Sequence, residues 1–257
     1  MKENILWLWL SRLNLDPTNL REALKRLSPT NIWQMQEKKL KEIFTSAEVK
    51  RILDVQYRKN LDKYKEYMIK NKINFITIDD ENYPEILKSL EDAPVFLYTL
   101  GNEKLLKQKS IAIVGSRRCS QYGKTMSQAF SYLLAKNNIT IVSGLAQGID
   151  SYAHEGCLLA NGKTIAVIGT GIDIMYPKEN KSLAEEIIKK GGLIISEYPL
   201  GTRPNKNNFP RRNRIIGGLS KGILVIEAGE KSGALITVNY ALEQGKEVYV
   251  IPRKYYK

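Results

Sequence analysis

The sequence predicts an α/β fold, with a doubly wound and mostly parallel sheet preceded by a small all-helical N-terminal domain. Short β-branched apolar runs recur through residues 110–257, and helix-like stretches separate them. Residues 1–72 instead show apolar side chains at helical spacing with Lys and Glu between them. Strands that are apolar on both faces and alternate with helices are typical of a parallel sheet covered on both sides. This arrangement is Rossmann-like.

Helices are expected first along the chain. Asp16-Pro17 and Ser28-Pro29 fit helix starts, because proline at the first helical position gives up no hydrogen bond that the helix needs. A long amphipathic stretch covers residues 47–72. Two short strands, INFITIDD (73–80) and PVFLYTLG (94–101), then lead into the α/β part.

Six apolar runs follow, each four to seven residues long, and helix-like stretches lie between them. Several of these stretches end in Gly or Asn, as helix C-termini prefer. The runs are IAIV (111–114), ITIV (139–142), TIAVIG (164–169), LIIS (193–196), GILVIEA (222–228) and EVYVIP (247–252).

Gly or Ser follows most of the predicted strands directly. Ligands of such sheets bind beyond the carboxyl ends of the strands, where backbone N–H groups and helix N-termini can hold an anion. A single turn of this kind commonly serves only to reverse the chain, whereas five along one edge favour a phosphate-lined groove. The five turns are GSRR (115–118), SGLAQGID (143–150), GTGIDIMYP (169–177), SEYPLG (196–201) and EAGEKSGALIT (227–237).

The charge balance favours a polyanionic partner. The 257 residues carry 40 basic and 27 acidic side chains, a net charge of +13. Residues 203–221 hold six basic side chains and no acidic one. Such a segment binds polyanions through counterion release, although a solvated basic loop would look the same.

Other classes of protein fit the composition poorly. No apolar run approaches the roughly 20 residues of a membrane helix, and the N-terminus lacks the pattern of a signal peptide. Two cysteines and one histidine cannot build a disulfide framework or a zinc cage. We therefore expect a cytoplasmic protein with no metal site.

The fingerprints of nucleotide cofactors are incomplete, so no cofactor is predicted. Gly115 is followed by Gly123 rather than by a G-x-G-x-x-G pattern, and Ser143-Gly144 stands where a ribose-binding acid would be expected. Gly123-Lys124-Thr125 lies too far from Gly115 for a Walker A loop. Lys124 is expected on the first helix of the sheet domain.

No complete catalytic constellation is found either, so the chain is not predicted to be an enzyme. His154 is the only histidine, and a structural histidine held by Asp150 or a backbone carbonyl is the favoured interpretation. Glu227 could act as an acid or base, or could cap the following turn.

The segment RPNKNNFPRRNRIIGGLS (203–220) carries the most specific signal. Phe209 stands among cations and asparagines, the setting in which an aromatic ring stacks on a base while the cations pair with phosphates. The alternative is that Phe209 anchors the loop. Ile215 and Ile216 are assigned to a core helix, with Asn213 and Arg214 at its start.

In order and spacing, these elements resemble the DNA-processing protein A (DprA/Smf) family. The resemblance covers roughly residues 80–252 and includes GSRR, SGLAQGID, GTGIDIMYP, SEYPLGTRP, FPRRNRII and the EAGEKSGALIT segment. It implies a single-stranded DNA-binding protein of natural transformation and recombination. Such a protein protects single strands, helps to load the RecA recombinase onto them, and is usually a homodimer without catalytic turnover.

Carried over to matching positions, the resemblance implies phosphate contacts by Arg117 and Lys206 and base stacking by Phe209. The remaining residues would line the same DNA-binding pocket through side chains or backbone groups. They are Ser116, Gly144, Gly148, Arg211, Asn213, Arg214, Ser232 and Gly233.

The implied domains are a SAM-like helical module over residues 1–72 and a Rossmann-like DNA-binding domain over residues 73–257, with the family's winged-helix domain absent. Rival hypotheses are an enzyme resembling phosphoribohydrolases, which act on nucleoside monophosphates, and a sensor that binds a nucleotide without turnover. EAGEKSGALIT echoes the phosphoribohydrolase motif only loosely, and the basic loop has no place in it.

Overall fold

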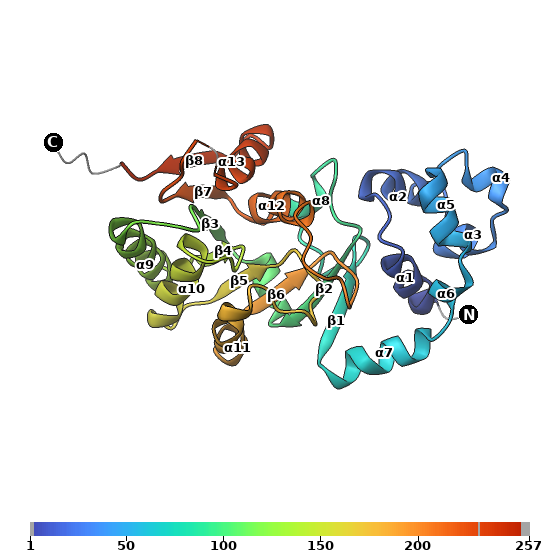
Figure 1. Ribbon diagram of the computed structural model, residues 1–257, viewed down its shortest axis with the longest axis horizontal. Coiled ribbons are helices and arrows are strands. Elements are labelled where there is room, and N and C mark those ends of the chain that lie inside the picture. Colours follow the sequence, from blue (N-terminus) through green and yellow to red (C-terminus); the bar gives the residue numbers. More distant parts are fainter. Residues whose placement is uncertain (1–2, 231, 253–257) are drawn as a thin grey trace.

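The computed structural model describes residues 3–230 and 232–252, and residues 253–257 of the second predicted domain lie outside this range. Helices alone form the first part of the chain (Figure 1). They are α1 (Glu3–Arg12), α2 (Pro17–Leu24), α3 (Pro29–Gln34), α4 (Glu37–Leu40), α5 (Ser46–Leu53), α6 (Val55–Arg58) and α7 (Leu61–Lys70).

Both predicted helix starts are confirmed. The Asp16 side chain accepts hydrogen bonds from the N–H groups of Thr18 and Asn19 at the start of α2. Ser28 and Asn31 form a reciprocal capping box at the start of α3. These side chains satisfy N–H groups that have no partner within their own helices.

An eight-stranded sheet forms the second part, in the order β1-β2-β6-β5-β4-β3-β7-β8. The six predicted runs after residue 110 pair in parallel, as expected. The two earlier strands join the same sheet, antiparallel, at one edge. The strands are β1 (Ile73–Thr77), β2 (Phe96–Gly101), β3 (Ser110–Val114), β4 (Thr140–Ser143), β5 (Thr164–Val167), β6 (Leu193–Ser196), β7 (Gly222–Val225) and β8 (Glu247–Val250).

Helices cover both faces of the sheet, which makes it doubly wound (Figure 1). One face carries α9 (Gln121–Lys136), α10 (Ile149–Leu159) and α11 (Lys181–Lys189), and the other carries α8 (Glu85–Lys88), α12 (Asn208–Leu219) and α13 (Ala234–Glu243). Short 3-10 turns, η1 (Glu103–Lys107) and η2 (Lys178–Asn180), complete the connections. The chain runs outward from β3 to β6 and then returns to β7 on the other side of β3. This reversal creates the crevice where such sheets bind ligands.

The helical module and the sheet share one hydrophobic core. Trp9 and Leu10 of α1 belong to the same buried cluster as Leu97 of β2 and Val114 of β3. Ser11 lies within 2.5 Å of the Tyr98 hydroxyl, which adds a buried polar contact to this junction. The predicted division into domains 1–72 and 73–257 stays a prediction. None of the helices described is long and apolar enough to cross a membrane.

Arg214 occupies a different place from the one expected. Helix α12 begins at Asn208, so Arg214 lies in its second turn, and its guanidinium is fully buried. It bonds both carboxylate oxygens of Glu197, at 2.8 and 2.7 Å, and lies 2.9 Å from the Asp92 carboxylate. Burial opposes its charge, but the two carboxylates outweigh that effect and raise the pKa of Arg214. The assignment of Arg214 to the DNA-binding pocket is therefore wrong, because this side chain stabilises the fold.

His154 is a buried structural residue of α10, but its partner is neither Asp150 nor a backbone carbonyl. Its Nδ1 lies 2.7 Å from the Thr164 hydroxyl, which itself donates to the Ile141 carbonyl. The hydroxyl therefore accepts the Nδ1–H. Burial, together with the charge of Arg212, lowers the pKa of His154 to about 3.

Replacing Arg214 should destabilise the fold strongly. Arg214→Ala leaves the buried Glu197 carboxylate without its partner, so we expect a loss of about 3–5 kcal/mol in the free energy of unfolding. Chemical denaturation measures this loss. The exposed Arg26→Ala is the control and should change stability by about 0.5 kcal/mol or less; equal losses in the two variants would contradict the role given to Arg214.

Acid should weaken the fold through His154. Because the folded-state pKa lies below the unfolded value of 6.5, stability present above pH 6.5 is lost as the pH falls toward about 3. In this range the imidazole binds a proton in the unfolded chain but not in the folded chain. The free energy of unfolding therefore falls by up to about 1.4 kcal/mol per pH unit. Denaturation of the wild type and His154→Asn between pH 7.5 and 5.5 measures the difference. Parallel curves for the two proteins would contradict this account.

Candidate functional site

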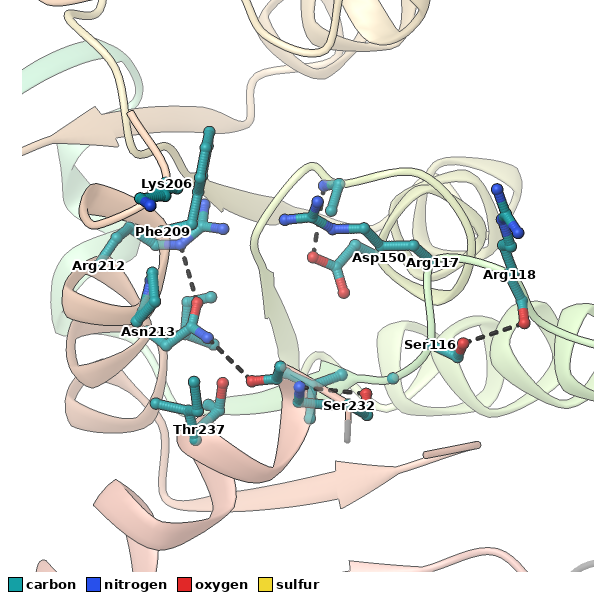
Figure 2. A pocket seen from close by; sticks show the side chains of 18 of the residues that line it. Ser116, Arg117, Arg118, Asp150, Lys206, Phe209, Arg212, Asn213, Ser232 and Thr237 are labelled. Atoms are coloured by element: carbon teal, nitrogen blue, oxygen red, sulfur yellow. Dashed lines mark hydrogen bonds between the residues drawn. The ribbon is translucent and has the colours of Figure 1, made fainter. Parts of the chain in front are cut away.

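A hollow of about 860 Å³ opens at the carboxyl ends of β3 and β7, the point where the strand order reverses. Its walls come from the turn after β3, the start of α10, the loop before α12 and the β7–α13 connection (Figure 2). Sequence-predicted residues from three separated segments meet here. They are Ser116, Arg117, Lys206, Phe209, Asn213, Ser232 and Gly233.

Two adjoining turns form the back of the hollow, and close packing between them requires glycine. Gly148 has φ +80°, and a Cβ there would lie 2.4 Å from the Ser116 carbonyl oxygen and 2.5 Å from that of Arg117. The Ser116 N–H donates to the Glu227 carbonyl at 2.7 Å. Gly148 thus supports the β3 turn from beneath and does not line the hollow.

Arg212 joins α12 to the ends of two strands. Its Nη1 donates to the Gly144 carbonyl after β4, at 2.8 Å, and to the Val167 carbonyl of β5. Burial lowers the pKa of Arg212 to about 10, and the nearby Asp150 carboxylate opposes that shift. Arg212 therefore keeps its positive charge at neutral pH while lying on the floor of the hollow.

Asp150 organises the turn opposite Arg212. Its carboxylate accepts hydrogen bonds from the N–H groups of Gly144, at 3.1 Å, and Ala146, at 3.4 Å. Burial raises the pKa of Asp150, whereas Arg212 and these N–H donors lower it. A Cβ on Gly144 would lie 2.7 Å from the Asp150 carboxylate and 2.8 Å from Arg212, so only glycine fits between the two charges.

Aromatic rings and cations meet at the mouth of the hollow. The half-buried ring of Phe209 lies 5.5 Å from that of Tyr176, which is 40% exposed. The Arg117 guanidinium reaches across the hollow to within 5.7 Å of the Phe209 ring centre (Figure 2). Lys206 is exposed at the same rim. Rings and cations in this arrangement can hold a planar base next to phosphates.

Asn213 ties the two walls together. Its side-chain oxygen accepts from Arg212 Nε at 3.1 Å, and its amide donates to the Gly233 carbonyl at 3.3 Å. Helix α12 is thereby fixed to the β7–α13 connection, so Asn213 braces the hollow as well as lining it.

Arg211 lies apart from the hollow. Its guanidinium points to the helical module, where Nη2 lies 3.5 Å from the Asp16 carboxylate, and it lines a separate small cavity. Gly144 lines a neighbouring hollow of about 260 Å³, which shares Arg117, Tyr176, Phe209 and Arg212 with the main one.

Four charged or aromatic residues that line the hollow were not predicted from the sequence, namely Arg118, Asp150, Tyr176 and Arg212. Tyr176 and Asp150 stand in strand-exit turns that were singled out, so their position was a usable signal. Arg212 belongs to the basic run, but nothing in the run distinguishes it from Arg211 or Arg214.

Glu227, the candidate acid or base, lies outside this hollow. Glu227 accepts from the backbone N–H of Ser120 at 3.1 Å and from its hydroxyl at 2.7 Å, and so lies at the start of α9. Over residues 3–230 and 232–252, no three side chains of His, Cys, Asp or Glu gather closely enough to hold a metal ion.

Comparison with known proteins identifies relatives along most of the chain. A family model described as DNA recombination-mediator protein A matches residues 74–257. The chain is similar to Protein Smf of Synechocystis, with 40% identity over 97% of this chain and 65% of that protein. It is also similar to DNA processing protein DprA of Streptococcus pneumoniae, with 48% identity over 70% of this chain and 64% of the relative. The chain thus spans less than two thirds of the length of either relative.

Solved structures of two relatives have the same fold. The X-ray structure of DprA from S. pneumoniae matches with a TM-score of 0.80 and 38% identity, over 96% of this chain and 85% of that one. DprA from Helicobacter pylori, in a structure described by its single-stranded DNA binding mode, matches with a TM-score of 0.66 and 34% identity, over 71% and 82%. With a family model that covers more than half of its length and relatives of this similarity, the chain belongs to the DNA processing protein A (DprA/Smf) family.

Proposed function

We propose that this chain binds single-stranded DNA in the hollow at the carboxyl ends of β3 and β7. The observation that carries the proposal is the cluster of Phe209, Tyr176 and Arg117, with Lys206 at the rim. A flexible single strand can turn a base onto the Phe209 ring while its phosphates reach the cations. The bases of a paired duplex are stacked on each other and cannot do so without unpairing.

Phosphates would contact Arg117, Lys206 and the backbone groups of the Ser116 and Ser232–Gly233 turns. The buried charge of Arg212 favours an anion above it. Stacking and phosphate contacts carry little sequence information, so binding would be nearly independent of base sequence.

The cellular role we propose follows from the family. Its relatives include proteins named for DNA processing in S. pneumoniae and Bacillus subtilis, and the H. pylori structure concerns single-stranded DNA. We infer that this chain acts in natural transformation and recombination in the cytoplasm. It would protect single strands, help RecA to load onto them and work as a homodimer, with no turnover of its own.

Fluorescence anisotropy with labelled oligo-dT and a matching duplex, each across a salt series, tests the binding proposal. Tight, salt-dependent binding that prefers the single strand is expected. Equal weak binding to both would mean that the +13 charge acts only as a generic polycation. Competition by a nucleoside monophosphate would instead favour a nucleotide sensor, and release of free base would favour a phosphoribohydrolase.

Removing the Phe209 ring should weaken binding to oligo-dT. Base stacking on one aromatic ring contributes about 1–3 kcal/mol, so Phe209→Ala is expected to lose that amount in anisotropy titrations. Phe209→Tyr keeps the ring and serves as the control. An affinity of Phe209→Ala equal to that of the wild type would mean that Phe209 anchors the loop only.

Each phosphate-binding cation should contribute to the salt dependence of binding. Arg117→Ala and Lys206→Ala are each expected to lower the slope of log K against log salt concentration by about one unit. Arg203→Ala removes an exposed charge from the same loop but outside the hollow, and should leave the slope nearly unchanged. Similar slopes in all three variants would mean that Arg117 and Lys206 do not contact phosphates.

A further inference from the structure

A lysine stands just before every parallel strand, at the edge of the sheet opposite the hollow. Each lies within four residues of the first residue of its strand, and neighbouring strands bring these lysines side by side. In sheet order from β6 to β8 they are Lys190, Lys163, Lys136, Lys109, Lys221 and Lys246, here called the lysine row.

Backbone hydrogen bonds join the segments that carry these lysines. The Thr140 N–H donates to the Lys109 carbonyl at 3.0 Å, and the Lys221 N–H donates to the Ser110 carbonyl at 2.9 Å. The Ile141 N–H donates to the Lys163 carbonyl at 3.2 Å. Since adjacent strands lie about 4.8 Å apart, the six lysines cover a line of about 24 Å.

Helix ends explain part of this row, because lysine near a helix C-terminus offsets the partial negative charge of the free carbonyls. Lys246 donates to the Gly217 and Gly218 carbonyls of α12, at 2.6 and 2.8 Å. Lys163 donates to the Lys190 carbonyl beyond α11, at 2.5 Å. The ammonium groups of these two lysines thus stabilise the fold.

Lys136 is the last residue of α9, so the helix-end effect applies to it as well, and its ammonium lies 5.5 Å from the centre of the Tyr132 ring. Lys109 and Lys221 are left over by that explanation. Lys109, Lys136 and Lys221 are all exposed, and within the described chain their ammonium groups make no hydrogen bond or ion pair. Burial and the charge of Lys221 together lower the pKa of Lys246 to about 8. At this end of the row, the positive charges of Lys221 and Lys246 therefore repel each other.

The row borders a hollow of about 550 Å³ between the ends of α9 and α10. Lys109, Lys136 and Lys163 line it together with the amides of Asn138 and Asn161, and none of its lining residues is acidic. By contrast, the turns at the carboxyl edge mix their cations with Asp173, Glu179, Glu197, Glu227 and Glu230. The part of the amino edge around this hollow is thus uniformly positive, whereas Glu247 stands next to Lys246 at the β8 end of the row.

We propose that the lysine row is a second binding surface, which takes the phosphate backbone of a nucleic acid strand. Exposed lysines that stand before neighbouring strands offer a row of cations to a chain of phosphates, and they would contact no base edges, so single strands and duplexes would both bind. This surface is separate from the hollow at β3 and β7 and does not depend on the function proposed there.

The test uses a chain whose first site is already weakened by Arg117→Ala and Phe209→Ala. In this background, Lys109→Gln, Lys136→Gln and Lys221→Gln are added together, since none of the three ammonium groups makes a hydrogen bond or ion pair within the described chain. The matched control replaces three exposed lysines of the helical module, Lys38, Lys50 and Lys65, by Gln. Titration of a long oligo-dT and of a long duplex across a salt series is the measurement.

The row variant should lower the salt slope for oligo-dT by about two units, at about 0.7 per lost charge, and should lower duplex binding as well. The control should keep the slope of its parent. Equal losses in both triple variants would overturn the proposal in favour of a general charge effect. Binding of polyglutamate as tight as that of oligo-dT, lost in the row variant, would overturn it in favour of an acidic peptide.

Footprinting of the unmodified chain gives a readout that needs no variant. Acetylation of lysines with and without a long oligo-dT should show protection of Lys109, Lys136 and Lys221, and unchanged labelling of Lys38, Lys50 and Lys65. Unchanged labelling of the row at saturating DNA would overturn the proposal.

Discussion

The Arg212 guanidinium connects α12, the helix that carries the Phe209 ring, to the ends of β4 and β5. Its bonds to the Gly144 and Val167 carbonyls fix α12 across the ends of β4 and β5. The Asp150 carboxylate favours the charged form of Arg212 and orders the turn beside it. The guanidinium thus helps to set the position of Phe209 above the strand ends and, together with Asp150, the shape of the Gly144 turn.

Four consecutive side chains of α12 point to four different neighbours. Arg211 faces Asp16 of the helical module, Arg212 the strand ends, Asn213 the Gly233 carbonyl, and Arg214 the carboxylates of Glu197 and Asp92. Successive residues of a helix project about 100° apart. One run of residues therefore supplies a contact with the helical module, the floor of the hollow, a hydrogen bond to the β7–α13 connection and a buried ion pair. The site is thus held from all sides by a single turn of helix.

The sheet domain could be predicted well because buried parallel strands leave an unambiguous record, a β-branched run followed by a glycine turn. Once the strands are parallel, their carboxyl ends must share an edge, which is why the turns that hold Ser116 and Gly233 could be brought together from sequence, whereas Phe209 was joined to them by the family resemblance. The pairing of β2 with β6 could not be foreseen, since antiparallel edge pairing depends on contacts far apart in the chain. Nor could Arg214 be told from Arg212, because the phase of α12 follows from its start at Asn208, five residues before the predicted one.

The junction between the helical module and the sheet has a consequence for how these proteins can be recombined. Trp7 packs edge-on against Phe96, with ring centres 6.5 Å apart, and Arg21 donates to the Lys88 carbonyl at 2.9 Å. The surfaces of the helical module and of the sheet are complementary at this junction, so the module cannot be exchanged without changing the surface against which it packs. A chimaera that grafts the first 72 residues of a distant homologue onto this sheet would have to bring along the matching surface of β2 and α8.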